Sequence, residues 1–177
     1  MEIFSIVTRS ITKNGVTAHK DPKLPPLPHV SDGPDWTNIL NLFNPEQATL
    51  LVATVQTLYP HRGVAPTVYR RVVVNFDKLA SQTPSAARLS LAFCDKLSAA
   101  SPVSFTELAE TYRISALKTI ETTPEFIFVQ RMSVRYLYDD LEIWASFGYE
   151  GASYHLGGYI KRGFDDLNWL PPLPNDL

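Results

Sequence analysis

The side chains that could do acid–base or metal chemistry in this chain are few and widely spaced. No two of the four histidines lie three or four residues apart, the spacing of metal ligands on one helix face. His61 lies in a turn between Pro60 and Gly63, where we expect its ring to bond backbone carbonyls rather than a metal. For His155, in a glycine-rich stretch, two interpretations stay open: it reaches toward a neighbouring active site, or it is a hydrogen-bonded tail residue.

One group contains the residue types of a hydrolase triad: Ser153, His155 and Asp165 or Asp166. Nothing in the spacing fixes their geometry, and the sequence has no Gly-x-Ser-x-Gly nucleophile elbow. The pattern therefore does not predict a hydrolase.

Three carboxylates stand close together at Asp139, Asp140 and Glu142. Adjacent carboxylates raise each other's pKa, which suits a general acid. Consecutive helical positions point in different directions, however, so we do not expect these groups to converge. The sequence favours a solvated helix end or an interface patch here.

The composition narrows the class of protein. The chain has 177 residues, 45% hydrophobic and 19% charged, which is ordinary for one globular domain. Its net charge is −2 and its basic residues are scattered, so no electrostatic footprint for nucleic acid is present. No apolar run reaches the roughly 18 residues of a membrane span. The single cysteine, Cys94, excludes an intrachain disulfide and is expected to be a small core side chain.

Prolines and capping residues divide the chain into an irregular arm over residues 1–34 and a helical region over residues 35–147. A short helix is predicted from Asp35 to about Phe43, and Asn44 with Gln47 predicts a capping box that starts the next helix. Later helices are predicted to start at Thr83, at a Ser104–Glu107 capping box and at Thr123. Three stripes of apolar residues at helical spacing support these helices: Val68 to Leu79, Leu89 to Leu97 and Phe105 to Ile120.

The segment from Glu125 to about Tyr138 is apolar on nearly every side, which predicts the buried central helix of the bundle. Residues 138–145 continue it or form a short extra helix bearing Trp144. Alternating strand residues are absent except from Ile3 to Val7. We therefore predict an all-α bundle of four to six helices.

The C-terminal tail, residues 148–177, contains five of the eight glycines beside large aromatic residues. Glycine weakens helices and strands, whereas large rings avoid water. We therefore expect the tail to gain its shape by packing on the bundle and on a second protein.

Four segments in and just before the tail resemble the small-subunit family typified by gluconate 2-dehydrogenase subunit 3: residues 138–144, 148–153, 157–159 and 162–171. That family has a Trp before a Gly-Tyr turn and an Asp-Trp-Leu-Pro ending. Residues 43–61, with their Tyr59-Pro60 close, are similar to its opening helix. The resemblance covers about residues 43–174.

The resemblance implies a cofactor-free small subunit that stabilises a large oxidoreductase of the glucose–methanol–choline type and assists its maturation. The large partner carries FAD and oxidises an alcohol group of a sugar or polyol, with or without a cytochrome c subunit in the complex. No catalytic, cofactor-binding or metal-binding residue is then expected in this chain. The N-terminus lacks the basic start and cleavage site of a signal peptide. We therefore expect a cytoplasmic protein, periplasmic export together with the partner, or earlier removal of a leader.

Eight residues are predicted to contact the partner: Trp144, Tyr149, Tyr154, His155, Tyr159, Arg162, Phe164 and Trp169. Among them we expect Tyr149 and Trp169 to be the most internal. Two alternatives stay open. One is a free-standing small enzyme that uses His155 with Asp165, and the other is a helical ligand-binding module with a closed apolar pocket.

Overall fold

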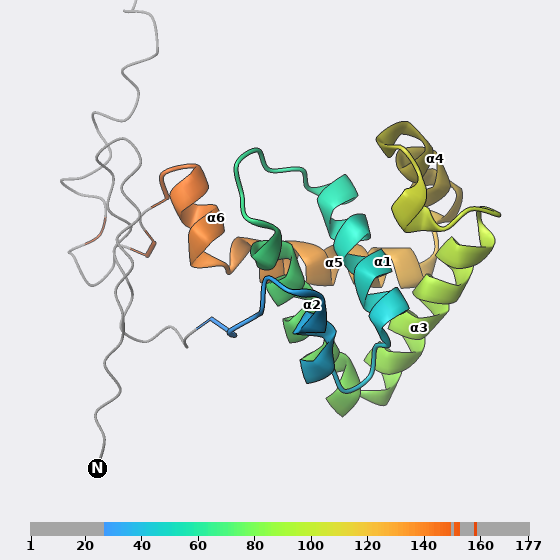
Figure 1. Ribbon diagram of the computed structural model, residues 1–177, viewed down its shortest axis with the longest axis horizontal. Coiled ribbons are helices and arrows are strands. Elements are labelled where there is room, and N and C mark those ends of the chain that lie inside the picture. Colours follow the sequence, from blue (N-terminus) through green and yellow to red (C-terminus); the bar gives the residue numbers. More distant parts are fainter. Residues whose placement is uncertain (1–26, 150, 153–157, 159–177) are drawn as a thin grey trace, which may run out of the picture.

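Six α-helices and two short 3-10 helices make up the part of the chain that the structure describes, which is residues 27–149, 151–152 and 158 of a computed structural model (Figure 1). In chain order the elements are η1 (Pro34–Ile39), α1 (Pro45–Leu58), α2 (Pro66–Gln82), α3 (Pro84–Ala99), η2 (Phe105–Glu107), α4 (Glu110–Ile120), α5 (Pro124–Tyr138) and α6 (Leu141–Ser146). The described residues contain no strand, and the prediction of an all-α bundle is confirmed. The alternating strand pattern noted from Ile3 to Val7 lies outside the described residues.

The helix starts follow local sequence signals. Each of α1, α2, α3 and α5 begins with a proline, whose missing N–H costs nothing at that position. The Asn44 side chain accepts from the Gln47 N–H at 2.8 Å, and the Gln47 side chain accepts from the Asn44 N–H at 3.1 Å. The Thr123 hydroxyl accepts from the Phe126 N–H at the start of α5. The predicted starts at these residues and at Thr83 are therefore confirmed.

The predicted capping box of Ser104 and Glu107 is wrong. The Ser104 hydroxyl instead bonds the Thr106 hydroxyl at 2.9 Å, and a single 3-10 turn forms before α4 begins. Arg113 of α4 donates to the carbonyls of Phe105 and Thr106, which holds η2 as a separate turn against the start of α4.

The short helix predicted to end near Phe43 is the 3-10 helix η1, which ends at Ile39. The cause lies in α2, where the buried carboxylate of Asp77 accepts the backbone N–H groups of Asn41, Leu42 and Phe43 at 2.8–2.9 Å. Because these N–H groups bond a side chain, they do not bond the helical carbonyls that would extend η1.

The helix α5 is not buried on every side as predicted. It packs on α1, α2, α3 and α6, and its buried residues form one stripe: Phe126, Val129, Ser133 and Leu137. Its apolar residues Ile127, Val134 and Tyr138 are 37%, 39% and 36% exposed on the other side. In Figure 1, α5 passes behind α1 and α2 and forms one side of the bundle rather than its centre.

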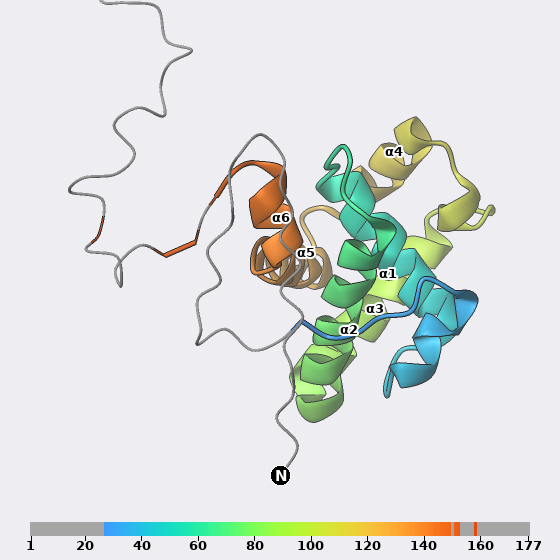
Figure 2. The ribbon, with the colours of Figure 1, turned by 60° about the vertical axis from the view of Figure 1, so that its left-hand side comes forward.

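The core has two parts. The main core joins α1, α2, α3, α4 and α5 around fully buried side chains such as Leu51, Val73 and Phe93. A smaller cluster lies at the end of the bundle that carries α6: Val55, Val68, Tyr69, Val72, Leu137 and Ile143. Figure 2 shows α6 beside the end of α5, away from α3 and α4. Among the helices of the described residues, none combines the length and the apolar character needed to cross a bilayer.

Candidate functional site

Partly exposed aromatic rings gather where α5 ends and α6 begins. The ring of Tyr138, the last residue of α5, packs against Tyr59, His61 and Phe147, with ring centroids 6.2, 5.6 and 6.4 Å apart. We call these four residues the aromatic cluster. Phe147 is 54% exposed, so the cluster presents apolar surface to solvent at this end of the bundle.

A turn at Gly148, directly after Phe147, fixes the position of Tyr149. Gly148 has a φ of +77°, a conformation that glycine adopts at the C-terminal end of a helix without strain. The turn lets the Tyr149 N–H donate to the Trp144 carbonyl at 2.9 Å and brings the two rings into a T-shaped contact at 5.1 Å. The Trp144 indole N–H donates to the Tyr138 carbonyl. Gly148 therefore allows the turn that places the Tyr149 ring against Trp144.

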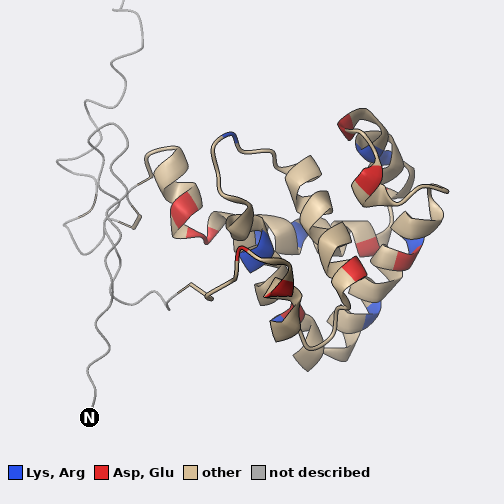
Figure 3. Ribbon diagram, viewed as in Figure 1, with Lys and Arg blue, Asp and Glu red and all other residues tan. Residues whose placement is uncertain are grey.

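A buried ion pair fixes the position of α6. The Arg71 guanidinium on α2 donates to both carboxylate oxygens of Asp140, with Nε–Oδ2 2.6 Å and Nη2–Oδ1 3.1 Å, and lies 3.2 Å from Glu142 Oε1. The side chains of Arg71 and Asp140 are 9% and 2% exposed. Burial alone would lower the pKa of Arg71, but the hydrogen bond to Asp140 and the charges of Asp140 and Glu142 raise it. The guanidinium therefore stays charged. Figure 3 shows acidic residues at the start of α6 beside basic residues of α2.

Asp140 also caps α6, because its carboxylate accepts the Glu142 N–H at 2.9 Å. The prediction of a solvated helix end is wrong for Asp140, and the prediction that the carboxylates do not converge is wrong for Asp140 and Glu142, which meet at one guanidinium. Asp139 is exposed as expected. A signal was present in the sequence: Arg71 stands between the apolar residues of α2 that face inward, where a charge needs a partner.

Apolar packing adds to the ion pair. Ile143 is fully buried in the smaller core cluster, against residues from α1, α2 and α5. The helix α6 has six residues, too few to be stable alone. It is therefore held by one buried side chain and one buried ion pair, and these two contacts set where Trp144 and Phe147 lie.

Two of the eight predicted contact residues, Trp144 and Tyr149, are described, and the structure brings them together. The expectation that Tyr149 is among the most internal is wrong, since it is 39% exposed. The other six lie outside the described residues: Tyr154, His155, Tyr159, Arg162, Phe164 and Trp169. So do the triad of residue types at Ser153, His155 and Asp165 or Asp166, and His19.

Two other ionisable side chains that the sequence analysis considered, His61 and Cys94, have structural roles. His61 bonds the Tyr138 hydroxyl through Nε2 at 3.1 Å, rather than a backbone carbonyl as expected. Its backbone N–H donates to the Tyr69 hydroxyl at 3.0 Å. Cys94 is a buried core side chain as predicted, and burial raises its pKa to about 12. No group of three or more metal-binding side chains occurs within residues 27–149 and the other described positions.

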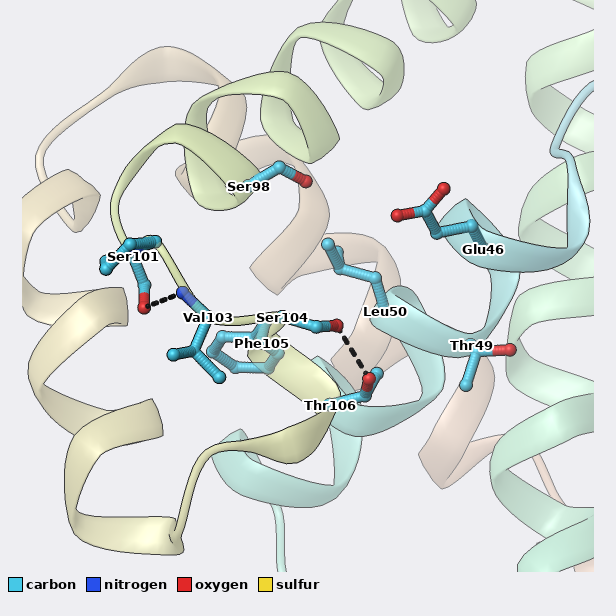
Figure 4. Close-up of a pocket in the computed structure, with 10 residues that line it drawn as sticks. Glu46, Thr49, Leu50, Ser98, Ser101, Val103, Ser104, Phe105 and Thr106 are labelled. Atoms are coloured by element: carbon cyan, nitrogen blue, oxygen red, sulfur yellow. Dashed lines mark hydrogen bonds between the residues drawn. The ribbon is translucent and has the colours of Figure 1, made fainter.

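A pocket of about 460 Å³ lies between the first turns of α1 and the segment from α3 to η2 (Figure 4). It is lined by Glu46, Thr49, Leu50, Ser98, Ser101, Pro102, Val103, Ser104, Phe105 and Thr106. Four of its hydroxyls already have partners, since Thr49 donates to the Pro45 carbonyl, Ser101 accepts the Val103 N–H and Ser104 bonds Thr106. Its hydroxyl-rich wall differs from the closed apolar pocket that a ligand-binding module predicts.

The aromatic cluster with Trp144 and Tyr149 is therefore the candidate site, and its chemistry is that of binding. Aromatic residues and arginine are enriched in protein interfaces, and Tyr, Trp and Arg contribute most of the binding energy there. Comparison of the chain with known protein families, with curated proteins and with solved structures gave no match.

Proposed function

We propose that this chain is the non-catalytic small subunit of a large FAD-dependent oxidoreductase of the glucose–methanol–choline type. In this proposal the partner binds FAD and oxidises an alcohol group of a sugar or polyol, with or without a cytochrome c subunit. The chain itself holds no cofactor; it stabilises the partner and assists its maturation. The complex forms in the cytoplasm and either stays there or is exported together with the partner.

One observation carries the proposal. Three of the aromatic rings at the α5–α6 end, Tyr138, Trp144 and Tyr149, belong to residues 138–144 and 148–149, on which the family resemblance rests, and the exposed ring of Phe147 lies between these two segments. The buried pair of Arg71 and Asp140 holds these rings in place before any partner arrives. A surface fixed in this way loses little conformational entropy on binding, which favours affinity.

To test the proposal, the affinity-tagged full-length chain is purified from its native host. We expect a large subunit to co-purify with stoichiometric flavin absorbance and to oxidise a sugar or polyol with an artificial electron acceptor. Deletion of this chain's gene should lower the soluble amount of that flavoprotein about tenfold, because obligate interfaces bury roughly 2,000–5,000 Å² that would otherwise face water.

Two matched variants sharpen this test. Phe147→Asp should lose most of the co-purified flavin, whereas Tyr112→Asp, on α4 and 66% exposed, should retain it. A purified chain that carries its own stoichiometric flavin, or a flavoprotein that is equally soluble and active without this chain, would overturn the proposal.

A further inference from the structure

The solvent-facing side of α5 carries a continuous row of apolar and basic side chains. Ile127, Arg131, Val134 and Tyr138 stand at positions i, i+4, i+7 and i+11, which share one helix face, and Arg135 borders them. We call these five residues the α5 ridge. All five are exposed, although the opposite face of the same helix is fully engaged with the core.

The ridge runs into the aromatic cluster. Tyr138 belongs to both, and its ring contacts Phe147 at 6.4 Å. Five of the nine large hydrophobic residues that are exposed in the described part lie on α5 and in the turn after α6: Ile127, Val134, Tyr138, Phe147 and Tyr149. Single exposed apolar residues are common on any protein, but a connected row is typical of a surface that another molecule covers.

The basic residues of the ridge lack carboxylate partners within the described residues. The three ion pairs found there join Arg71 to Asp140 and Glu142, and Lys96 to Glu125. Arg131 and Arg135 belong to none of these pairs, and they stand four residues apart on one helix, where like charges repel. A neighbouring surface with carboxylates would relieve this repulsion and gain charge-assisted hydrogen bonds.

The dimensions fit the middle of a protein interface. From Ile127 to Tyr138 the ridge rises about 16 Å along the helix axis, and the aromatic cluster extends it further. A standard interface covers about 800 Å² on each partner, with an apolar centre and charged residues toward the rim. Ile127, Val134 and Tyr138 give the apolar centre, and Arg131 and Arg135 give charges beside it.

We infer that the α5 ridge is the surface on which the large flavoprotein docks, and that the opposing surface is apolar with carboxylates facing Arg131 and Arg135. This inference rests on the proposed function and adds to it: docking involves α5, which precedes the tail and, apart from Tyr138, lies outside the four C-terminal segments that resemble the family.

The experiment compares four forms of the affinity-tagged full-length chain in the native host: wild type, Val134→Glu, Arg131→Glu and the control Ile114→Glu. Val134 and Ile114 are both 39% exposed and both lie within helices, so the two glutamates perturb this chain's own fold alike. Circular dichroism should show the same helix content in all four. We expect the two ridge variants to lower the co-purified flavin about tenfold, as a new charge facing carboxylates or apolar surface weakens docking. Arg131→Lys, which keeps the charge, should retain most of it.

Three outcomes are distinct. Loss of flavin in both ridge variants but not in the control supports the inference. Equal flavin in all four forms overturns it and leaves the proposed function standing. Absence of any co-purified flavoprotein with the wild type overturns both.

A photo-crosslinking residue in place of Val134 identifies the molecule that covers the ridge. We expect an adduct with the flavoprotein, and none from the same probe in place of Ile114. An adduct within this chain, for example with residues 153–177, or with a second copy of the chain, would overturn the docking assignment.

Discussion

The helix α2 organises two neighbouring segments with two buried charged residues, and it does so in different ways. Asp77 holds the segment before α1 through three backbone N–H groups, and no cation lies within 4 Å of it among the described residues. Arg71 holds α6 through a carboxylate of opposite charge, Asp140. The carboxylate of Asp77 is therefore compensated by neutral backbone N–H dipoles, whereas the charge of Arg71 is compensated by an opposite charge.

The segment before α1 depends less on its buried charged residue than α6 does. The segment before α1 is covalently continuous with a helix of the main core and packs Phe43 there. The short helix α6 has only Ile143 in the smaller cluster, so the ion pair carries much of its attachment. Removing one partner of a buried pair also leaves the other charge without compensation. We therefore expect α6, with the aromatic rings it bears, to be the more sensitive of the two.

The largest effect is expected for Asp140→Asn. This change keeps the shape and the α6 cap but removes the charge that compensates Arg71, so the free energy of unfolding should fall by about 3 kcal/mol. A urea titration followed by circular dichroism measures the fall, and amide hydrogen exchange should rise in α6 more than in α1.

The exposed neighbour Asp139 supplies the control, since Asp139→Asn should change stability by less than about 0.5 kcal/mol. A fall for Asp140→Asn no larger than this control would show that Glu142 alone compensates Arg71, and the contrast between the two sites would disappear.

Helix starts were predictable because their signals are local. Asn44 with Gln47, and Thr123 before a proline, form bonds within three residues of each other. The Ser104 signal failed because Arg113, nine residues on, holds the carbonyls of a 3-10 turn in its place. The burial of α5 was overestimated because an apolar residue has the same appearance in a sequence whether it faces a core or solvent.

The candidate site was predictable only in part. The identities of Trp144 and Tyr149 came from the sequence, and Gly148 between α6 and Tyr149 is the local residue that sets their contact. The ion pair that positions α6 joins residues 69 positions apart, a pairing that no local period encodes. The contacts of Asp77 with the segment before α1 are hidden for the same reason.

A smaller effect is expected for the matched change Asp77→Asn. The amide oxygen still accepts the N–H groups of Leu42 and Phe43, whereas the new NH2 group faces the Asn41 N–H and cannot accept it. One buried hydrogen bond is lost and no opposite charge is left uncompensated, so the free energy of unfolding should fall by about 1–2 kcal/mol. The same urea titration compares it directly with Asp140→Asn. An equal or larger fall for Asp77→Asn would reverse the proposed ranking of the two sites.

The smallest effect concerns the main core, where Cys94 is a titratable group that remains neutral in the folded state. Burial raises its pKa from 9.0 to about 12, so as pH rises above 9.0 the unfolded chain loses a proton that the folded chain keeps. Since the folded state then binds more protons, its stability falls with pH until the folded thiol also ionises near pH 12.

Between about pH 9.5 and 10.5 the fall from this group should be about 1 kcal/mol. Tyr59 and Tyr136 also have raised pKa values, so the effect is read as the difference between wild type and Cys94→Ala in urea titrations at the two pH values. An equal fall in the free energy of unfolding for wild type and Cys94→Ala would mean that water reaches the thiol in the folded chain. A thiol reagent that reacts with Cys94 in the folded chain as fast as in urea would lead to the same conclusion. The main core around Cys94 would then be accessible to solvent, as the α6 end of the bundle is.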